Sequence, residues 1–128
     1  MKFLLDTHTL IYYYLEGAEM LSVNARAVIE EQEAIYVSVA SLWEMGIKKS
    51  IGKLNIRQSI VEIADMCRDQ GIGILDLKAE YIDYIGKLPD IHRDPFDRII
   101  LATAKVEEMV IVTKDSSIWA YPDIRLLW

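Results

Sequence analysis

Met1-Lys2-Phe3-Leu4-Leu5-Asp6 opens the chain, and this short apolar run stops at an aspartate. The pattern predicts a buried strand that ends in a carboxylate, with a helix beginning just beyond it. Val110-Ile111-Val112-Thr113-Lys114-Asp115, near the other end, has the same form. If the two strands are neighbours in a parallel sheet, their terminal aspartates meet at one edge, where two carboxylates repel each other unless a cation lies between them. Asp6 is therefore a candidate metal ligand.

Short apolar runs alternate with longer amphipathic stretches along the chain, which indicates βα units around a parallel sheet. The predicted strands are Lys2–Leu5, Ala34–Val37, Ile72–Leu75, Val110–Thr113 and Ile124–Leu127. The predicted helices are Thr9–Leu15, Ser22–Glu31, Ser38–Lys49, Ser59–Gly71, Lys78–Gly86 and a last long helix that Asp94-Pro95 opens. A chain of 128 residues without a linker or a repeat predicts one α/β domain, residues 1–128.

The composition limits the classes of protein that the chain can belong to. Its 14 basic and 20 acidic residues give a net charge of −6, which by itself argues against nucleic-acid binding. Basic residues nevertheless group locally, at Lys48, Lys49, Lys53 and Arg57 and beside the acidic motifs at Arg93, Arg98 and Lys114. Cys67 is the only cysteine, and no apolar run approaches the roughly 18–20 residues of a membrane span. These features predict a cytoplasmic protein without membrane contact.

Four acidic side chains can reach one place in such a fold. Ligands of an open α/β sheet bind beyond the carboxyl ends of its strands. Asp6 and Asp115 each end a predicted strand, and Asp97 lies in the first turn of a helix that enters from that edge. Glu44 lies about two turns into the helix after the second strand. The joint pattern favours a shared metal site.

Each of these acids also has an ordinary structural interpretation. Asp6 can cap the helix that follows it, and Asp97, at the third helical position, can interact favourably with the helix dipole. Asp115 can be a turn residue. Glu44 has Lys48 four residues later, which is the spacing of a surface ion pair.

The remaining polar residues near these acids carry weaker signals. Asp94 before Pro95 has the form of a helix cap. His8 can touch the rim of the site but is interpreted as structural, and His92 falls in a predicted loop. One cysteine and two distant histidines make a zinc site improbable. Residues 12–14, three consecutive tyrosines, are interpreted as core and interface residues rather than as a stacking platform for bases.

Four segments resemble PIN domains, and more narrowly the VapC-type toxins of bacterial and archaeal toxin–antitoxin pairs. In chain order they are Leu4-Leu5-Asp6-Thr7-His8-Thr9-Leu10, Ser38-Val39-Ala40-Ser41-Leu42-Trp43-Glu44, Asp94-Pro95-Phe96-Asp97-Arg98-Ile99-Ile100-Leu101-Ala102-Thr103-Ala104 and Val112-Thr113-Lys114-Asp115. The resemblance implies a five-stranded parallel sheet flanked by helices. It also implies a Mg²⁺-dependent or Mn²⁺-dependent ribonuclease that is paired with an antitoxin, and a homodimer is expected.

The same resemblance assigns roles to individual residues. The family's acids match Asp6, Glu44, Asp97 and Asp115, and Thr113 matches a hydroxyl position that supports the site. We hypothesise that Asp6, Asp97 and Asp115 bind metal directly or through water, and that Glu44 orients a second ion or the attacking water. Asp94 and Arg98 are expected to support the site or its RNA substrate, with Lys114 and Lys48 as further cations near it.

Three other functions stay open at this stage. A housekeeping RNA-processing or DNA-directed PIN nuclease would carry the same acids as a toxin. A receiver-like phosphotransfer domain also places aspartates around Mg²⁺, but it needs an acidic pair where this chain has Asp6 alone. A non-catalytic interaction module would be expected to have lost one of the four acids, and all four are present.

Overall fold

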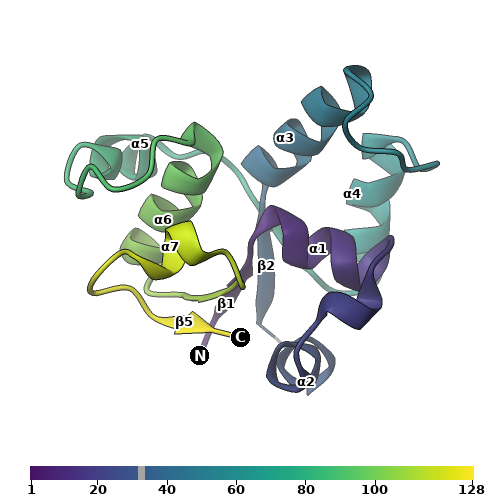
Figure 1. Ribbon diagram of the computed structural model, residues 1–128, viewed down its shortest axis with the longest axis horizontal. Coiled ribbons are helices and arrows are strands. Elements are labelled where there is room, and N and C mark those ends of the chain that lie inside the picture. The colour runs from purple at the N-terminus through teal and green to yellow at the C-terminus, as the bar shows by residue number, and fades with distance from the viewer. Residues whose placement is uncertain (32–33) are drawn as a thin grey trace.

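The protein is an α/β fold built on a five-stranded parallel sheet, as a computed structural model describes it for residues 1–31 and 34–128 (Figure 1). The strands lie in the order β3-β2-β1-β4-β5. They are β1 (Phe3–Leu5), β2 (Ile35–Ser38), β3 (Gly73–Leu75), β4 (Val110–Val112) and β5 (Leu126–Leu127). The predicted class, the five strands and the adjacency of β1 and β4 are confirmed.

Helices cover both faces of the sheet. They are α1 (Thr7–Tyr14), the short 3₁₀ helix η1 (Ala18–Met20), α2 (Val23–Glu31), α3 (Val39–Ser50), α4 (Ile60–Asp69), α5 (Ala79–Ile85), α6 (Pro95–Glu107) and α7 (Ser116–Trp119). In Figure 1, α1 to α4 lie on one side of the strands, and α5, α6 and α7 lie on the other. The six helices predicted from the sequence are present, whereas η1 and α7 are too short for a periodic pattern to predict.

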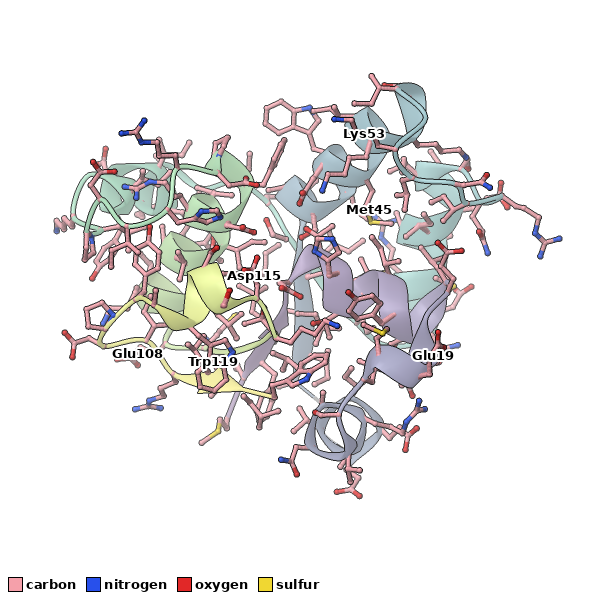
Figure 2. All side chains as sticks on the ribbon, in the orientation of Figure 1. Glu19, Met45, Lys53, Glu108, Asp115 and Trp119 are labelled. Atoms are coloured by element: carbon pink, nitrogen blue, oxygen red, sulfur yellow. The ribbon has the colours of Figure 1, made fainter. Side chains whose placement is uncertain are left out.

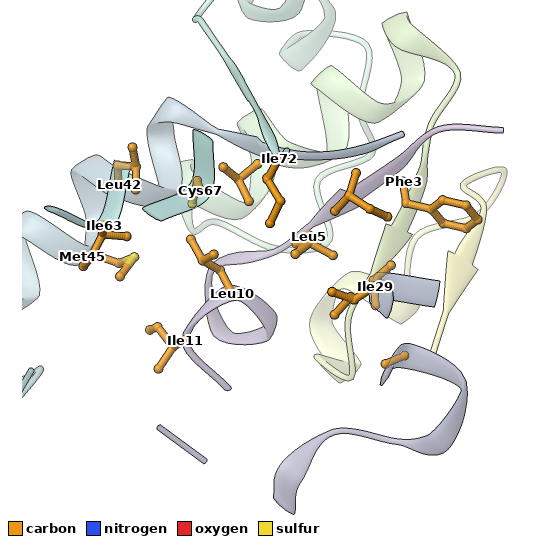
Figure 3. Packing of buried hydrophobic residues seen from close by; sticks show 14 of the residues in the cluster. Phe3, Leu5, Leu10, Ile11, Ile29, Leu42, Met45, Ile63, Cys67 and Ile72 are labelled. Atoms are coloured by element: carbon orange, nitrogen blue, oxygen red, sulfur yellow. The ribbon is translucent and has the colours of Figure 1, made fainter. Parts of the chain in front are cut away.

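Alternating side chains of the strands enter two separate cores. Phe3 and Leu5 of β1 pack with α1, α2, α3 and α4 (Figure 3). Leu4 packs with α6 and α7 on the opposite face. This alternation is the two-residue period of a strand that is buried on both faces, and it explains the continuous apolar runs. Cys67 is fully buried in the first core, as expected of a small hydrophobic residue.

Strand register determines where the polar residues lie. Leu5 is paired with Val37 on one side and with Val112 on the other. The residues that follow, Asp6 and Thr113 among them, therefore reach the same edge of the sheet. Three helices begin at this edge with an aspartate cap, so their N-terminal backbone N–H groups are directed toward it.

Several element boundaries differ from the predicted ones by one to two residues. The first helix begins at Thr7 rather than Thr9, because Asp6 is itself its cap. The last strand is Leu126–Leu127, shorter than the apolar pattern indicates. Within the described residues, no helix combines the length and the apolar character that crossing a bilayer requires.

Candidate active site

Asp6 lies at the centre of the polar edge, and its side chain is held by three donors. Oδ1 accepts hydrogen bonds from the backbone N–H of Thr9 (2.9 Å) and from the Thr9 hydroxyl (2.6 Å). Oδ2 accepts one from the Thr113 hydroxyl (2.5 Å). The residue is only 3% exposed, and burial raises the pKa of its carboxyl although these hydrogen bonds oppose the shift. Asp6 is thus both a helix cap and a buried acid that faces the site.

Thr113 connects Asp6 to Asp115. Its hydroxyl donates to Asp6 and accepts from the backbone N–H of Asp115 (3.0 Å). Asp115 caps α7 by accepting from the N–H of Ser117 (2.9 Å), and Figure 2 shows it where that helix begins. Asp6 and Asp115 line the same cavity. The ends of β1 and β4 therefore bring these two acids together, as the sequence predicted.

Glu44 is the second buried acid, and side chains from two helices hold it. One carboxylate oxygen accepts from the Thr7 hydroxyl (2.7 Å), which is also hydrogen-bonded to Ser41 (2.9 Å). The other oxygen lies 2.8 Å from the ammonium of Lys48. The predicted pair with Lys48 is present, but Glu44 is 4% exposed and is not a surface residue. Thr7 begins α1, so this contact joins α3 to the helix that Asp6 caps.

Asp97 is half-buried, and its carboxyl group contacts a histidine. Its Oδ2 lies 2.7 Å from Nε2 of His92. Burial raises the pKa of Asp97 to about 6; the His92 hydrogen bond opposes the shift, and the charges of Asp94, Asp115 and Glu44 add to it. Three neighbouring acids therefore act electrostatically on this carboxyl.

A network around Arg98 fixes the loop that carries His92. The Arg98 guanidinium donates to the carbonyls of Ile85, Pro89 and His92 and to the hydroxyl of Tyr121. Arg98 therefore holds the loop that carries His92, and its donors are directed to protein acceptors rather than to the cavity.

Asp94 acts first as a helix cap. Its Oδ1 accepts from the N–H groups of Phe96 (2.8 Å) and Asp97 (3.3 Å), as the Asp-Pro pattern predicted. Among the described residues, one group of potential metal ligands has its donor atoms within 4.8 Å of one another, and it is His92, Asp94 and Asp97. Asp6, Glu44 and Asp115 share the edge with this group at longer range.

The donor set suits a hard divalent cation. Among the described residues, Asp6 Oδ2 accepts one hydrogen bond, which leaves a carboxylate lone pair for a ligand at the cavity wall. Mg²⁺ is bound by one or two carboxylates and keeps several of its waters, so acids spaced more widely than a closed cage fit it. Every buried side-chain oxygen and nitrogen of the described residues has a hydrogen-bond partner, so these acids are held in place by the protein alone.

Sequence reasoning predicted Thr113 and Lys48 as partners of the acids but missed the other residues that hold them. Thr7, Thr9 and Ser41 are buried hydroxyl residues beside the predicted acids, and their position next to strand ends and caps was a usable signal. His92 was assigned to a loop without a role. Its contact with Asp97 depends on the course of residues 86–93, which no local pattern predicts.

Comparisons with known proteins agree with this geometry. The sequence model of the PIN domain matches residues 3–123. VapBC-1 from nontypeable Haemophilus influenzae has a similar structure (TM-score 0.71, 20% identity, covering 99% of this chain and 97% of that one). So does VapBC2 from Rickettsia felis, solved bound to a DNA fragment from their promoter (TM-score 0.70, 18% identity, 99% and 98% covered).

A more distant similarity involves VapC20 from Mycobacterium tuberculosis, described as a sarcin-ricin loop cleaving toxin (TM-score 0.60, 12% identity, 97% and 99% covered). Comparison with curated protein sequences gives no match. At these identities the structural similarities establish the fold.

Proposed function

This chain belongs to the PIN domain family, and we propose that it is a Mg²⁺-dependent endoribonuclease that acts in the cytoplasm as the toxin of a VapBC-type pair. The observation that carries the proposal is the chain of contacts from Asp6 through Thr113 to Asp115. It joins two strand ends and places two acids at one cavity, beside the acids of α3 and α6. PIN domains are a family of nucleases, and the acids at this edge are the ones that the resemblance to the family assigned to its site.

We assign the metal-holding role to Asp6, Asp97 and Asp115, with Glu44 beside them. A bound Mg²⁺, or Mn²⁺ in its place, would supply Lewis acidity at the phosphate and an acidified water for in-line hydrolysis of the phosphodiester. Carboxylate oxygens are the ligands that such hard ions prefer.

The chain's own residues prepare this chemistry. Thr113 and Thr9 hold the Asp6 carboxylate in one orientation, so no rearrangement of that side chain is needed when a ligand binds. Glu44, fixed by Thr7 and Lys48, offers an acceptor that can orient a water molecule. His92 holds Asp97, and when Asp97 is ionised the hydrogen between them belongs to Nε2.

The toxin assignment has a different basis from the nuclease assignment. Several structures similar to this chain are VapBC proteins, and one is described as a toxin–antitoxin complex from Klebsiella pneumoniae. We infer a cognate antitoxin for this chain and a homodimer of the toxin itself. Expression of the chain alone should arrest bacterial growth, and co-expression of the neighbouring small gene should relieve the arrest. A housekeeping PIN nuclease would cleave RNA without this neighbour-dependent arrest.

Asp6→Asn tests the nuclease proposal directly. The variant keeps the size of the side chain but removes the negative charge at the wall of the cavity, so Mg²⁺-dependent cleavage of single-stranded RNA should fall below detection. Circular dichroism should stay unchanged, because an asparagine can still cap α1. Asp69→Asn, at an exposed aspartate at the end of α4, is the matched control and should cleave normally.

Metal binding can be measured without cleavage. Mg²⁺ at 100 times its dissociation constant should stabilise the native protein by about 2.7 kcal/mol through mass action. The rise in melting temperature should shrink strongly in Asp6→Asn and persist in Asp69→Asn. Full cleavage by purified Asp6→Asn would refute the assignment of Asp6.

A further inference from the structure

A small cavity lies next to the acids. Asp6 and Asp115 form one wall of a cavity of about 300 Å³, and the rest of its lining includes His8, Tyr12, Lys114 and Ser116. This volume is at the lower end of the range for small-ligand pockets, about 300–1,000 Å³. The cavity therefore extends the acid site toward α1 and the start of α7, and Asp97 and His92 are not part of its lining.

Lys114 supplies the positive charge of this cavity. Its ammonium lies over the ring of Tyr12, 5.1 Å from the centroid, and the side chain is exposed. Among the described residues this ammonium has no carboxylate or carbonyl partner, in contrast to two of the other cations that the sequence placed near the site, Lys48 and Arg98. Lys48 is paired with Glu44, and Arg98 donates to three backbone carbonyls and to a tyrosine hydroxyl. Lys114 is thus the cation at the cavity wall that is available to a phosphate.

Two aromatic rings stand beside this cation. The ring centroids of His8 and Tyr12 lie 6.1 Å apart and their planes are tilted by 38°. His8 is exposed, and Tyr12 is half-buried against Gly17. Rings that line a groove together with a lysine are the combination by which proteins hold single-stranded nucleic acid, because every base has a π-face and every nucleotide a phosphate.

We propose that this cavity is a subsite for one nucleotide of single-stranded RNA, next to the phosphodiester that the acids would cleave. Lys114 binds the phosphate of that nucleotide, and Tyr12 and His8 contact its base. The inference rests on the proposed nuclease function and gives Tyr12 a role in place of the core or interface role expected from the tyrosine run. It also explains how a protein of net charge −6 holds a polyanion beside four acids.

The first test removes the charge. Lys114→Met should raise KM for a fluorescently labelled single-stranded RNA decamer about tenfold and change kcat by less than twofold, because the contact holds substrate rather than the reacting atoms. The dependence of log K on log salt should become shallower by about 0.7, the contribution of one phosphate contact on a single strand. Lys87→Met is the matched control, since Lys87 also lies over a tyrosine ring, that of Tyr84 at 5.6 Å, but lines a different pocket. An unchanged KM and salt slope in Lys114→Met would refute the proposal.

The second test removes the ring. Tyr12→Leu should raise KM about tenfold, and Tyr12→Phe should leave KM within twofold, since phenylalanine keeps the face on which a base rests. His8→Ala should raise KM by a smaller factor, because His8 is the more exposed ring. Equal KM values for Tyr12→Leu and Tyr12→Phe, with both variants folded by circular dichroism, would contradict the base contact.

A binding experiment separates this inference from the proposed function. Titration of ¹⁵N-labelled protein with each of AMP, GMP, CMP and UMP in EDTA should shift the amide signals of residues 8–12 and 113–116, and Lys114→Met should abolish the shifts. If these shifts occur but the wild-type protein cleaves no RNA with Mg²⁺, the nuclease proposal fails and the nucleotide site stands. If the wild-type protein cleaves RNA and neither the shifts nor the KM effects occur, the subsite is wrong.

Discussion

The two ends of the acid edge are built differently. At one end, which we call the strand side, Asp6 and Glu44 are 3% and 4% exposed and accept hydrogen bonds from threonines at strand ends and in α1. At the other, the loop side, the Asp97 and His92 side chains are 16% and 25% exposed, and the loop before α6 holds His92. The strand side is fixed by the fold, and the loop side is fixed by a network that solvent can reach.

This difference separates a part of the site that buried hydrogen bonds hold in place from a part whose charge changes near pH 6. Hydroxyl donors from the core support the Asp6 carboxylate although burial raises its pKa, and a hydroxyl donor also holds Glu44. Breaking one of these contacts should destabilise the protein. Asp97 has one side-chain partner, His92, and three acidic neighbours. Repulsion from these neighbours means that an ionised Asp97 destabilises the native state when no metal is bound. Removing support on the strand side and removing charge on the loop side should change stability in opposite directions.

Thr113→Val should have the largest effect on stability. Valine has nearly the same shape, but it deprives Asp6 Oδ2 of a donor and the Asp115 N–H of an acceptor. The free energy of unfolding in EDTA at pH 7 should fall by about 2 kcal/mol, as for hydrogen bonds to charged groups. The loss should be smaller in acid, where Asp6 is protonated and accepts more weakly. Urea denaturation at several pH values measures both quantities.

Thr103→Val is the control for this substitution. Thr103 is equally buried, but its hydroxyl donates to the carbonyl of Ile99 within the same helix (2.7 Å). That carbonyl remains available to the helical N–H four residues later, so the change should cost less than about 0.5 kcal/mol. Equal losses for the two threonines would show that Thr113 has no special role in supporting Asp6.

Lys48→Met should have an intermediate effect on the strand side. It removes the cation at 2.8 Å from a Glu44 carboxylate that is 6% exposed, although 36% of the Lys48 side chain is in solvent. Removing one partner of a fully buried ion pair lowers the free energy of unfolding by about 3–5 kcal/mol. Because Lys48 is partly exposed, we expect a decrease of about 1 kcal/mol. The rise in melting temperature with Mg²⁺ should become larger, because the ion no longer competes with the ammonium for Glu44.

Arg68→Met provides the surface comparison for that loss. Arg68 and Asp65 form an ion pair in which both side chains are more than 60% exposed, at 63% and 65%. Its removal should change the free energy of unfolding by less than about 0.5 kcal/mol and leave the Mg²⁺ response unaltered. A Lys48→Met protein that behaves like Arg68→Met would place Glu44 outside the electrostatics of the site.

The strand side could be predicted from the sequence, and the loop side only in part. Asp6 and Asp115 follow apolar runs whose burial on both faces is a property of the residues themselves, and parallel pairing then brings the two ends to one edge. The position of Glu44 on its helix could be predicted from helix periodicity. Its burial could not be predicted, because a lysine four residues later has the same spacing in a surface ion pair and in a buried one.

The geometry of the loop that carries His92 could not be predicted from the sequence. His92 reaches Asp97 because Arg98 and Tyr121, far apart in the chain, bind the backbone of one loop. Such a network depends on tertiary packing and leaves no periodic trace. The position of Asp97 in the first turn of α6 was predicted correctly from the Asp-Pro cap, while its contact with His92 was not predicted.

Of the three substitutions at the site, Asp97→Asn should have the smallest effect on stability, and the effect should have the opposite sign. Burial raises the pKa of Asp97 to about 6 from a model-peptide value of 3.8, so the native state holds this proton more tightly than the unfolded chain. The associated stability is fully present below pH 3.8 and is lost as the pH rises through 6. Asparagine does not ionise, and it should therefore stabilise the protein in EDTA by up to about 1 kcal/mol above pH 6.5, with allowance for solvent exposure.

The pH dependence of stability and its response to metal test whether ionisation of Asp97 causes the difference between Asp97→Asn and wild type. The stability difference between Asp97→Asn and wild type should grow between pH 4 and pH 6.5 and then level off. Saturating Mg²⁺ should reverse its sign, because the ion stabilises the wild-type carboxylate and not the amide. Urea denaturation of both proteins at pH 4, 5, 6 and 7, with EDTA and with Mg²⁺, measures the whole pattern. A variant that is less stable than wild type at pH 7 in EDTA would mean that the His92 contact outweighs the repulsion among the acids, and that the loop side is as firmly supported as the strand side.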